Sequence, residues 1–160
     1  MDAPVIEFNS KSAAFAEFSN FYPAPFVLDG QDWGTVEAYF QAQKFPGDEA
    51  LRARICDAPT AAAAKRLGRT RSAHFRADWD GAREGVMLAA LTAKFEQNPP
   101  LAALLKSTGD ATLKERSPWD AYWGTGKTGK GRNRMGALLM EVRRRLATAG
   151  GSAPPGAAAV

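Results

Sequence analysis

The stretch FVLDGQDWGTVEAYFQAQKF, residues 26–45, decides the fold, because it places a strand hairpin directly before a helix. Asp29-Gly30 separates two short apolar segments, and this pair favours the type I′ turn of a β-hairpin, since glycine accepts a positive φ. Thr35 is a helix N-cap by type, because its hydroxyl can accept a free backbone N–H, and Pro46-Gly47 ends the helix after about Lys44. The stretch therefore predicts mixed α and β structure.

Helical patterns dominate the rest of the chain. Apolar and alanine-rich segments alternate with prolines and glycines, whereas one short strand is expected near the N-terminus, at Val5 to Phe8. The patterns predict a mainly α fold with a small β component, of the α+β class, in one compact domain over residues 1–149 and a disordered tail over 150–160. The remaining predicted helices run from Asp48 to Asp57, from the cap Thr60 to Gly68, from Asp78 or Asp80 to about Phe95, from Pro99-Pro100 to Gly109, and onward from the cap Asn133.

Composition and charge exclude several classes of protein. Charged residues make up 24% and apolar residues 45% of the sequence, which is the balance of an ordinary folded domain. The N-terminus has no signal-peptide pattern and no apolar run is long enough to span a membrane, so we expect no membrane partner. The lone Cys56 favours the cytoplasm, and no cluster of cysteines and histidines is present to bind a metal. The net charge of +4 permits binding to phosphates, whether on a metabolite or on a nucleic acid.

Three polar residues share one face of the helix predicted after Thr35. At about 100° per residue, Glu37, Gln41 and Lys44 fall within about 60° of one another. Such a stripe either meets water or borders a ligand. The aromatic and amide side chains just upstream, in FSNFYPAPF at 18–26, can wall a cleft for a planar ligand and favour the second interpretation. The candidates from this upstream segment are Ser19, Asn20 and Phe21.

A second polar and aromatic segment, SPWDAYWG at 117–124, leads into the basic, glycine-rich stretch TGKTGKGRN at 125–133. Glycines leave backbone N–H groups approachable and the cations add positive potential, so this loop suits a phosphate unless it is a mobile basic connector. It is not a Walker A motif, because Ala121 stands where the first glycine is required. Trp79, followed one turn later by Arg83, either faces a base or belongs to the core.

These residues resemble the NADAR family, also called YbiA-like. The resemblance is carried by EFSNFYP at 17–23, WGTVEAYFQAQKF at 33–45 and the glycine and asparagine pattern of 117–136. Matching positions extend from Phe15 to Leu146 in the family's order and spacing. The sequence departs from the pattern at Ala38, where family members often carry histidine.

The resemblance implies a mostly helical domain that hydrolyses the N-glycosidic bond between a phosphorylated ribose and a base, with no cofactor. It implies a small-molecule substrate, either a ribosylaminopyrimidine phosphate of the riboflavin pathway or an ADP-ribose-type compound, ADP-ribosylated guanine in DNA included. Two other classes stay open. One is a non-catalytic ADP-ribose or NAD-binding module, and the other is a basic nucleic-acid-binding domain that uses Arg143, Arg144 and Arg145.

The reaction assigns roles to the candidates. Cleavage of a ribosyl C–N bond builds positive charge on the sugar and negative charge on the base, so it needs an acid and a stabilising carboxylate. We predict Glu37, Lys44 and Asp120 as catalytic: Lys44 polarises the ribose or attacks its anomeric carbon, while Glu37 or Asp120 transfers protons. The tryptophans border the base, and Arg83 with the Gly126 to Asn133 loop holds phosphate. The predicted substrate-binding residues are Ser19, Asn20, Phe21, Gln41, Trp79, Arg83, Trp123, Gly124, Gly126 and Asn133.

Overall fold

Two compact units make up the chain, and the computed structural model describes residues 3–151 of it. The central unit comprises residues 9–98, and the terminal unit comprises residues 1–8 together with 99–160. Helices make up most of the regular secondary structure, whereas each strand is three or four residues long. The fold is therefore mainly α with a small β component, as the sequence predicted. None of the helices within 3–151 combines the length and the apolar character that a membrane crossing requires.

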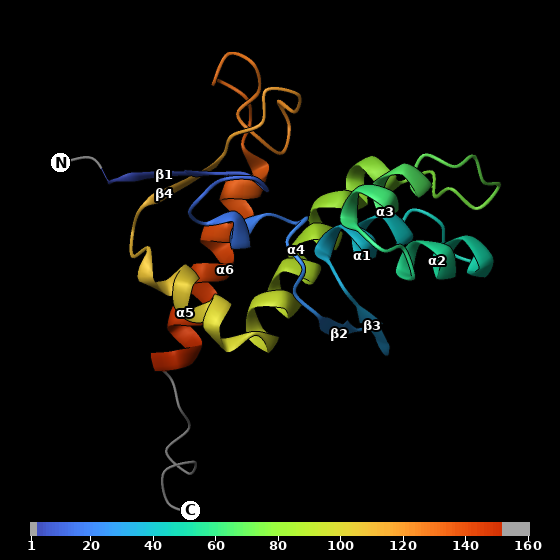
Figure 1. The fold of residues 1–160 in the computed structure, drawn as a ribbon, viewed down its shortest axis with the longest axis horizontal. Coiled ribbons are helices and arrows are strands. Elements are labelled where there is room, and N and C mark those ends of the chain that lie inside the picture. The colour runs from blue at the N-terminus through green and yellow to red at the C-terminus, as the bar shows by residue number, and fades with distance from the viewer. Residues whose placement is uncertain (1–2, 152–160) are drawn as a thin grey trace, which may run out of the picture. The chain divides into compact units, whose positions relative to one another are not determined.

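The elements follow one another along the chain as the ribbon in Figure 1 shows. The central unit contains the 3₁₀ helix η1 (Ala16–Phe18), β2 (Phe26–Leu28), β3 (Gln31–Trp33), α1 (Val36–Ala42), α2 (Glu49–Cys56), α3 (Ala61–Leu67) and α4 (Trp79–Gln97). The terminal unit contains β1 (Val5–Phe8), α5 (Pro99–Ser107), β4 (Thr112–Glu115) and α6 (Arg134–Gly151).

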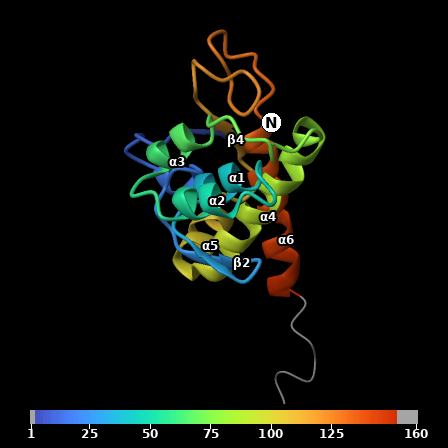
Figure 2. The same cartoon turned by 90° about the vertical axis from the view of Figure 1, so that its right-hand side faces the viewer.

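Helix α1 lies at the core of the central unit. It packs against α2, α3 and α4, and all of its residues are buried, the polar Glu37 and Gln41 included. Figure 2 shows α1 between α2, α3 and α4 from a second direction. The large side chains around it that are at most 2% exposed include Phe18, Trp33, Phe45, Ile55, Leu91 and Phe95.

The predicted hairpin is confirmed. Strands β2 and β3 pair antiparallel, with Phe26 opposite Trp33, and the turn residues Asp29 and Gly30 have φ angles of 56° and 73°. Two successive positive φ angles are the signature of the type I′ turn that Asp-Gly favours. The hairpin thus leads the chain into α1 in the way the sequence predicted.

Caps define most of the helix starts in the central unit. The side chains of Thr35, Asp48 and Thr60 each accept a backbone N–H at the start of α1, α2 and α3. The caps Thr35 and Thr60 were predicted, whereas Asp48 was predicted only as the start of a helix. Asp78, predicted as one of two possible starts of the helix, stands at the N-cap position of α4, but its carboxylate makes no cap bond; both of its oxygens accept from the guanidinium of Arg76. Helix α1 also ends at Ala42, about two residues earlier than predicted.

The terminal unit is built on a strand pair that the sequence did not reveal in full. Strand β1 was predicted, but β4 was not, and the two pair in parallel with Val5 opposite Thr112. Helix α6 packs against β4 and α5. Asn133, predicted as a cap, has a φ of 50° and uses its amide to donate to the Leu113 carbonyl and to accept from the Glu115 N–H. It therefore ties the start of α6 to β4.

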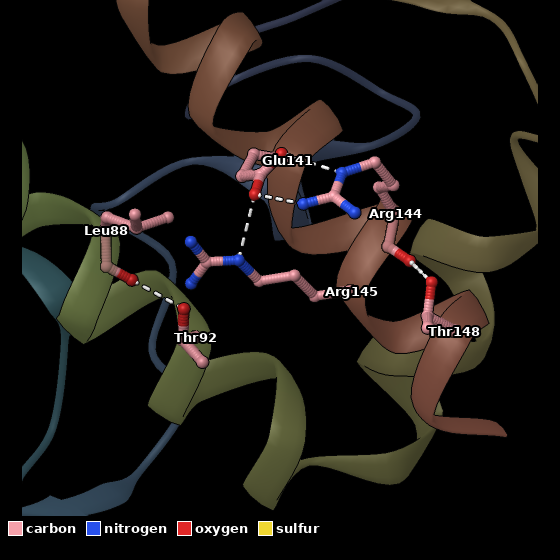
Figure 3. A network of polar contacts seen from close by, with 6 residues as sticks. All are labelled: Leu88, Thr92, Glu141, Arg144, Arg145 and Thr148. Carbon is pink, nitrogen blue, oxygen red and sulfur yellow. Dashed lines mark hydrogen bonds and ion pairs between the residues drawn. The ribbon is translucent and has the colours of Figure 1, made fainter. Parts of the chain in front are cut away.

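Helix α6 continues to Gly151, so the first two residues of the predicted tail belong to the helix, and 152–160 lie outside the described residues. Along α6, Glu141 accepts hydrogen bonds from Arg144 and Arg145 (Figure 3), and these bonds lower the pKa of its carboxyl to about 2. Arg143 donates to the Thr108 hydroxyl at 2.9 Å. All three arginines that suggested a nucleic-acid surface therefore have partners within the terminal unit.

Candidate active site

Glu37 is a buried carboxyl held by two amides. It is 3% exposed, its Oε2 accepts from Asn20 Nδ2 at 2.5 Å, and its Oε1 accepts from Gln41 Nε2 at 2.7 Å. The backbone N–H of Glu37 also donates to the Asn20 carbonyl at 3.0 Å. The interpretation of this helix face as a solvated surface is therefore wrong, and the predicted alignment of Glu37 with Gln41 is confirmed by a direct bond.

Burial changes the acidity of Glu37. Loss of water around the carboxyl raises its pKa, while the hydrogen bond from Gln41, the charge of Lys65, the hydrogen bond from Asn20 and the charge of Lys44 act in the opposite direction. The pKa stays above its ordinary value, because desolvation is the largest effect. A glutamate in this setting retains its proton to higher pH and suits the role of a general acid.

Lys44 lies just beyond the end of α1 and is half-buried. Its Nζ lies 5.9 Å from the centroid of the Trp79 ring. Burial lowers the pKa of the Lys44 amine; the charge of Glu37 opposes this shift, and the charges of Arg69 and Lys65 add to it. More of the amine is neutral near pH 7 than for a lysine in water, and the neutral form is the nucleophilic one.

Aromatic side chains border these two residues. Trp79 is 7% exposed and packs against Phe40 with ring centroids 4.9 Å apart, so it belongs to the core and to the edge of the candidate site at once. Phe21 is only half-buried, and the Nζ of Lys65 lies 5.7 Å from its ring. Arg83 is half-buried on α4, one turn after Trp79. Trp79 therefore lies beside the Lys44 amine, and Phe21 lies beside the Lys65 amine.

Lys94 is a structural residue of this site that the sequence analysis missed. It is fully buried, and its Nζ donates to the carbonyls of Glu17 and Ser19 at 2.6 and 2.9 Å. Burial lowers the pKa of this amine to about 7, against the opposing charge of Glu17. The Ser19 hydroxyl accepts from the Phe21 N–H at 3.1 Å, so Ser19 shapes the turn that carries Asn20.

Lys65 and Arg69, on α3 and just after it, were also missed. Their charges act on Lys44, and the charge of Lys65 acts on Glu37 as well. A signal for them exists in the sequence: 58–77 contains one lysine and four arginines but no aspartate or glutamate. Such a run points to a local excess of positive charge.

The loop 117–133 belongs to the terminal unit and uses much of its polar character internally. Asp120 Oδ1 accepts the backbone N–H groups of Tyr122 and Trp123 at 2.9 and 2.8 Å. A Cβ at Gly124 would approach the Glu115 carbonyl at 2.9 Å, so only glycine fits there without a shift. The backbone N–H groups of Thr125, Gly129, Gly131, Arg132 and Asn133 all donate to carbonyls of the same unit.

These hydrogen bonds bear on both interpretations of the loop, as a phosphate-binding loop and as a mobile connector. The loop is not an unstructured connector, because its backbone is bonded at many points. The N–H groups that were expected to face a phosphate are largely taken up by carbonyl oxygens. The binding roles predicted for Trp123, Gly124, Gly126 and Asn133, and the catalytic role of Asp120, stay predictions.

Comparison with known proteins identifies the family. The NADAR domain model matches residues 7–147, which extend over both units. N-glycosidase YbiA of Escherichia coli (strain K12) is 48% identical over 147 residues, covering 92% of this chain and 91% of that protein. The solved NMR structure of E. coli YbiA superposes with a TM-score of 0.86 at 45% identity and covers 96% of this chain and 91% of that one.

A riboflavin biosynthesis protein of Vibrio vulnificus is 45% identical over 128 residues, which are 80% of this chain and 35% of that longer protein. The two kinds of relative carry different names, and each matches at least 80% of this chain. With these matches and a family model that covers most of its length, the chain belongs to the NADAR domain family and groups with its N-glycosidases, as the sequence predicted.

Proposed function

We propose that the chain hydrolyses the N-glycosidic bond between a phosphorylated ribose and its base, with a ribosylaminopyrimidine phosphate of the riboflavin pathway as substrate. Relatives named as N-glycosidases and as riboflavin biosynthesis proteins support both halves of this proposal. The single observation that carries the chemistry is that Glu37 and Lys44 influence each other in a desolvated setting. Burial raises the pKa of the Glu37 carboxyl and lowers the pKa of the Lys44 amine, so both changes favour the neutral form of the group. A protonated acid and a free amine are what a C–N cleavage requires.

In the proposed reaction the Lys44 amine attacks the anomeric carbon of the ribose. A bond forms between Nζ and that carbon, the bond from carbon to the base nitrogen breaks, and its electron pair stays on the base. The proton of Glu37 goes to the departing base, and the lysine adduct loses a proton to the glutamate that results. Water then hydrolyses the adduct, which releases the ribose phosphate and restores the amine. Asn20 and Gln41 hold the Glu37 carboxyl in place for both proton transfers.

The base is assigned to the aromatic edge of the cluster. We propose that Phe21 and Trp79 border its plane, because they are the rings that lie beside Lys65 and Lys44. The family resemblance extends the substrate-binding set to Trp123, Gly124, Gly126 and Asn133 and gives Asp120 a share in proton transfer. The lone Cys56 leaves the cytoplasm as the expected compartment.

Product analysis tests the reaction and its substrate. Purified protein is incubated with a ribosylaminopyrimidine phosphate and, separately, with an oligonucleotide that contains ADP-ribosylated guanine, and released sugars are measured by mass spectrometry. Release of ribose 5-phosphate from the first substrate is the expected result. Release of ADP-ribose from the second alone replaces the proposed substrate with the DNA adduct, and tight binding of ADP-ribose without release from either substrate contradicts an enzymatic function.

Trapping tests the nucleophile. A glycosylamine on a lysine opens to an imine, which borohydride reduces to a stable amine, so reduction during turnover should add the mass of the sugar phosphate to the peptide that contains Lys44. Lys44→Arg retains the positive charge but cannot form the adduct, and it is the matched control. Turnover of Lys44→Arg at the wild-type rate would leave Lys44 only an electrostatic role.

A further inference from the structure

A basic stretch without acids borders the candidate active site. Between Asp57 and Asp78 the sequence has lysine or arginine at five positions and neither aspartate nor glutamate. The net charge of the whole protein is only +4, so α3 and the loop after it concentrate positive charge in the central unit. The five cations are Lys65, Arg66, Arg69, Arg71 and Arg76.

Two of these cations have other surroundings. Arg76 forms an ion pair with Asp78 at 2.7 Å. Arg66 lines a hollow between α2 and α3, where Asp57 is also found. The guanidinium of Arg76 therefore already has an acidic partner, and Arg66 borders a different hollow.

Lys65 and Arg69 face the catalytic cluster instead. Both charges act on the Lys44 amine, and the charge of Lys65 acts on the Glu37 carboxyl too. Lys65 Nζ lies 5.7 Å from the half-buried ring of Phe21. The two cations, Lys44 and one carboxyl thus lie near one another within the central unit.

The cluster has an excess of positive charge. Neither Lys65 nor Arg69 forms an ion pair with any residue in 3–151. The one carboxyl that acts on the cluster is Glu37, and burial disfavours its charged form. Lys65 and Arg69 are both exposed, so their charges are accessible to an anionic ligand. A phosphate ester fits the two side chains, because arginine offers a planar pair of donors and lysine a compact charge.

Gln41 gives a second, independent indication of a ligand. The residue is 4% exposed, its Nε2 donates to Glu37, and its Oε1 is a buried acceptor with no hydrogen-bond partner among the described residues. This oxygen lies against Gly68, between α3 and Arg69, where a Cβ would collide with it. A buried acceptor without a donor is unfavourable, and a sugar hydroxyl supplies a donor.

We propose that Lys65 and Arg69 bind the phosphate of the substrate, with the Gln41 carbonyl oxygen accepting a hydrogen bond from a ribose hydroxyl. The assignment rests on the proposed N-glycosidase function and identifies the residues that select a phosphorylated sugar. It differs from the sequence-based prediction, which gave the phosphate to Arg83 and the Gly126 to Asn133 loop. A ribose monophosphate and the diphosphate of ADP-ribose share the chemistry that the two cations recognise.

Calorimetric titration of the full chain with ribose 5-phosphate, ADP-ribose and unphosphorylated ribose tests the subsite. The wild type is expected to bind at least one phosphate ester more than about tenfold tighter than ribose. Lys65→Met and Arg69→Gln should each weaken that binding by about 10- to 100-fold. Arg66→Gln removes the same charge from the same turn of α3 and should leave the affinity unchanged. The tighter of the two phosphate esters identifies the source of the phosphate.

Two results overturn the subsite. One is equal affinity of the wild type for ribose and for both phosphate esters. The other is an equal loss of affinity in Arg66→Gln, Lys65→Met and Arg69→Gln, which is the behaviour of general surface charge. Equal thermal midpoints for the variants and the wild type establish that each is folded.

Kinetics separates this proposal from the proposed reaction. In Lys65→Met and Arg69→Gln, kcat/KM should fall about 10- to 100-fold on the phosphorylated substrate and by a clearly smaller factor on its dephosphorylated form, where only the effect of each charge on Lys44 remains. Arg66→Gln should match the wild type on both forms. Wild-type kcat/KM on the phosphorylated substrate in both variants overturns the subsite and leaves the N-glycosidase function standing. The predicted pattern of binding without any release of base supports the subsite and contradicts the reaction.

Discussion

Two segments of this protein look alike in sequence but differ in how they use their polar groups. The segment from Asn20 to Lys44 buries a carboxyl, holds it with two neutral amides and leaves a desolvated amine nearby. The loop 117–133 satisfies its carboxylate and many of its backbone N–H groups with its own chain. Buried polar groups that shift one another's pKa indicate a candidate catalytic site, whereas polar groups that bond to the adjacent backbone indicate a structural role in the loop.

The largest effect should come from removing the buried pair. Glu37→Gln keeps the size of the side chain but loses the acidic proton and one of the two acceptor oxygens. Lys44→Met keeps the length of the side chain but loses the amine. Each should lower kcat by about 10²- to 10⁴-fold, because a positioned acid or nucleophile contributes that much. Steady-state release of the base measures the effect. Calorimetry with ribose 5-phosphate, which should still bind, distinguishes lost chemistry from lost folding.

Gly136→Ala should have the next largest effect, on stability. A Cβ at this position in the first turn of α6 would collide with the Leu113 carbonyl of β4 and with the amide of Asn133. Overpacking of this kind costs about 1–3 kcal/mol of unfolding free energy, which urea denaturation measures. The control is Gly85→Ala on α4, where no atom lies within 4 Å of the new Cβ, and a gain of up to about 1 kcal/mol is expected. Equal stability of the two variants would refute the tight join of α6 to β4.

Variants of Asp120 test whether the loop 117–133 takes part in the reaction or only maintains its own structure. Asp120→Asn retains an oxygen to accept the Tyr122 and Trp123 N–H groups, whereas Asp120→Ala removes it. If the carboxylate only shapes the loop, the asparagine variant keeps kcat near the wild-type value and the alanine variant loses about 1 kcal/mol of stability. A loss of kcat in Asp120→Asn as large as that in Glu37→Gln would instead make Asp120 catalytic and remove the contrast between the segments.

The smallest effect is a change in the pH dependence of stability. Burial raises the pKa of Glu37 in the folded protein, so the folded state holds the proton more tightly than the unfolded chain does. The free energy of unfolding therefore falls as the pH rises from about 4.5 through the folded pKa. Glu37→Gln removes this cost, and the difference between variant and wild type should grow over that range and then level off.

Glu141→Gln provides the opposite sign for the same measurement. Its two arginine partners lower the pKa of Glu141 to about 2, so its contribution is present above pH 4.5 and is lost as the pH falls toward 2. Denaturant titrations at several pH values should give differences of opposite slope for the two variants. Parallel slopes would contradict the burial of a protonated Glu37.

Local signals in the sequence predicted much of the central unit. Thr60 and Gly68 bracket α3, and Asp29-Gly30 forms the turn of the hairpin, because caps and turns depend on residues that are adjacent in the chain. The sequence did not predict strand β4. Thr112–Glu115 has only one buried apolar side chain, and its partner strand β1 is distant in the sequence. Pairing between remote segments leaves no local pattern.

The candidate site was predicted only in part, for a similar reason. Helical spacing aligns Glu37 with Gln41, but it does not reveal that Asn20 reaches the second oxygen of the carboxyl. Lys94 reads as a surface lysine, although its amine lies fully buried under the Ser19 turn. Lys65 and Arg69 lie in a stretch without aspartate or glutamate, and this local excess of positive charge is visible only when the whole stretch is considered.

The parallel pairing of β1 with β4 sets an order for folding during synthesis. Residues 5–8 leave the ribosome first, yet their partners at 112–115 follow only after the whole central unit, residues 9–98, has been made. At a rate of synthesis of about 5–20 residues per second, β1 has no partner strand for at least several seconds. The central unit is contiguous in the chain, so it can fold in that interval. The unit that contains Glu37 and Lys44 can therefore fold before β1 pairs with β4.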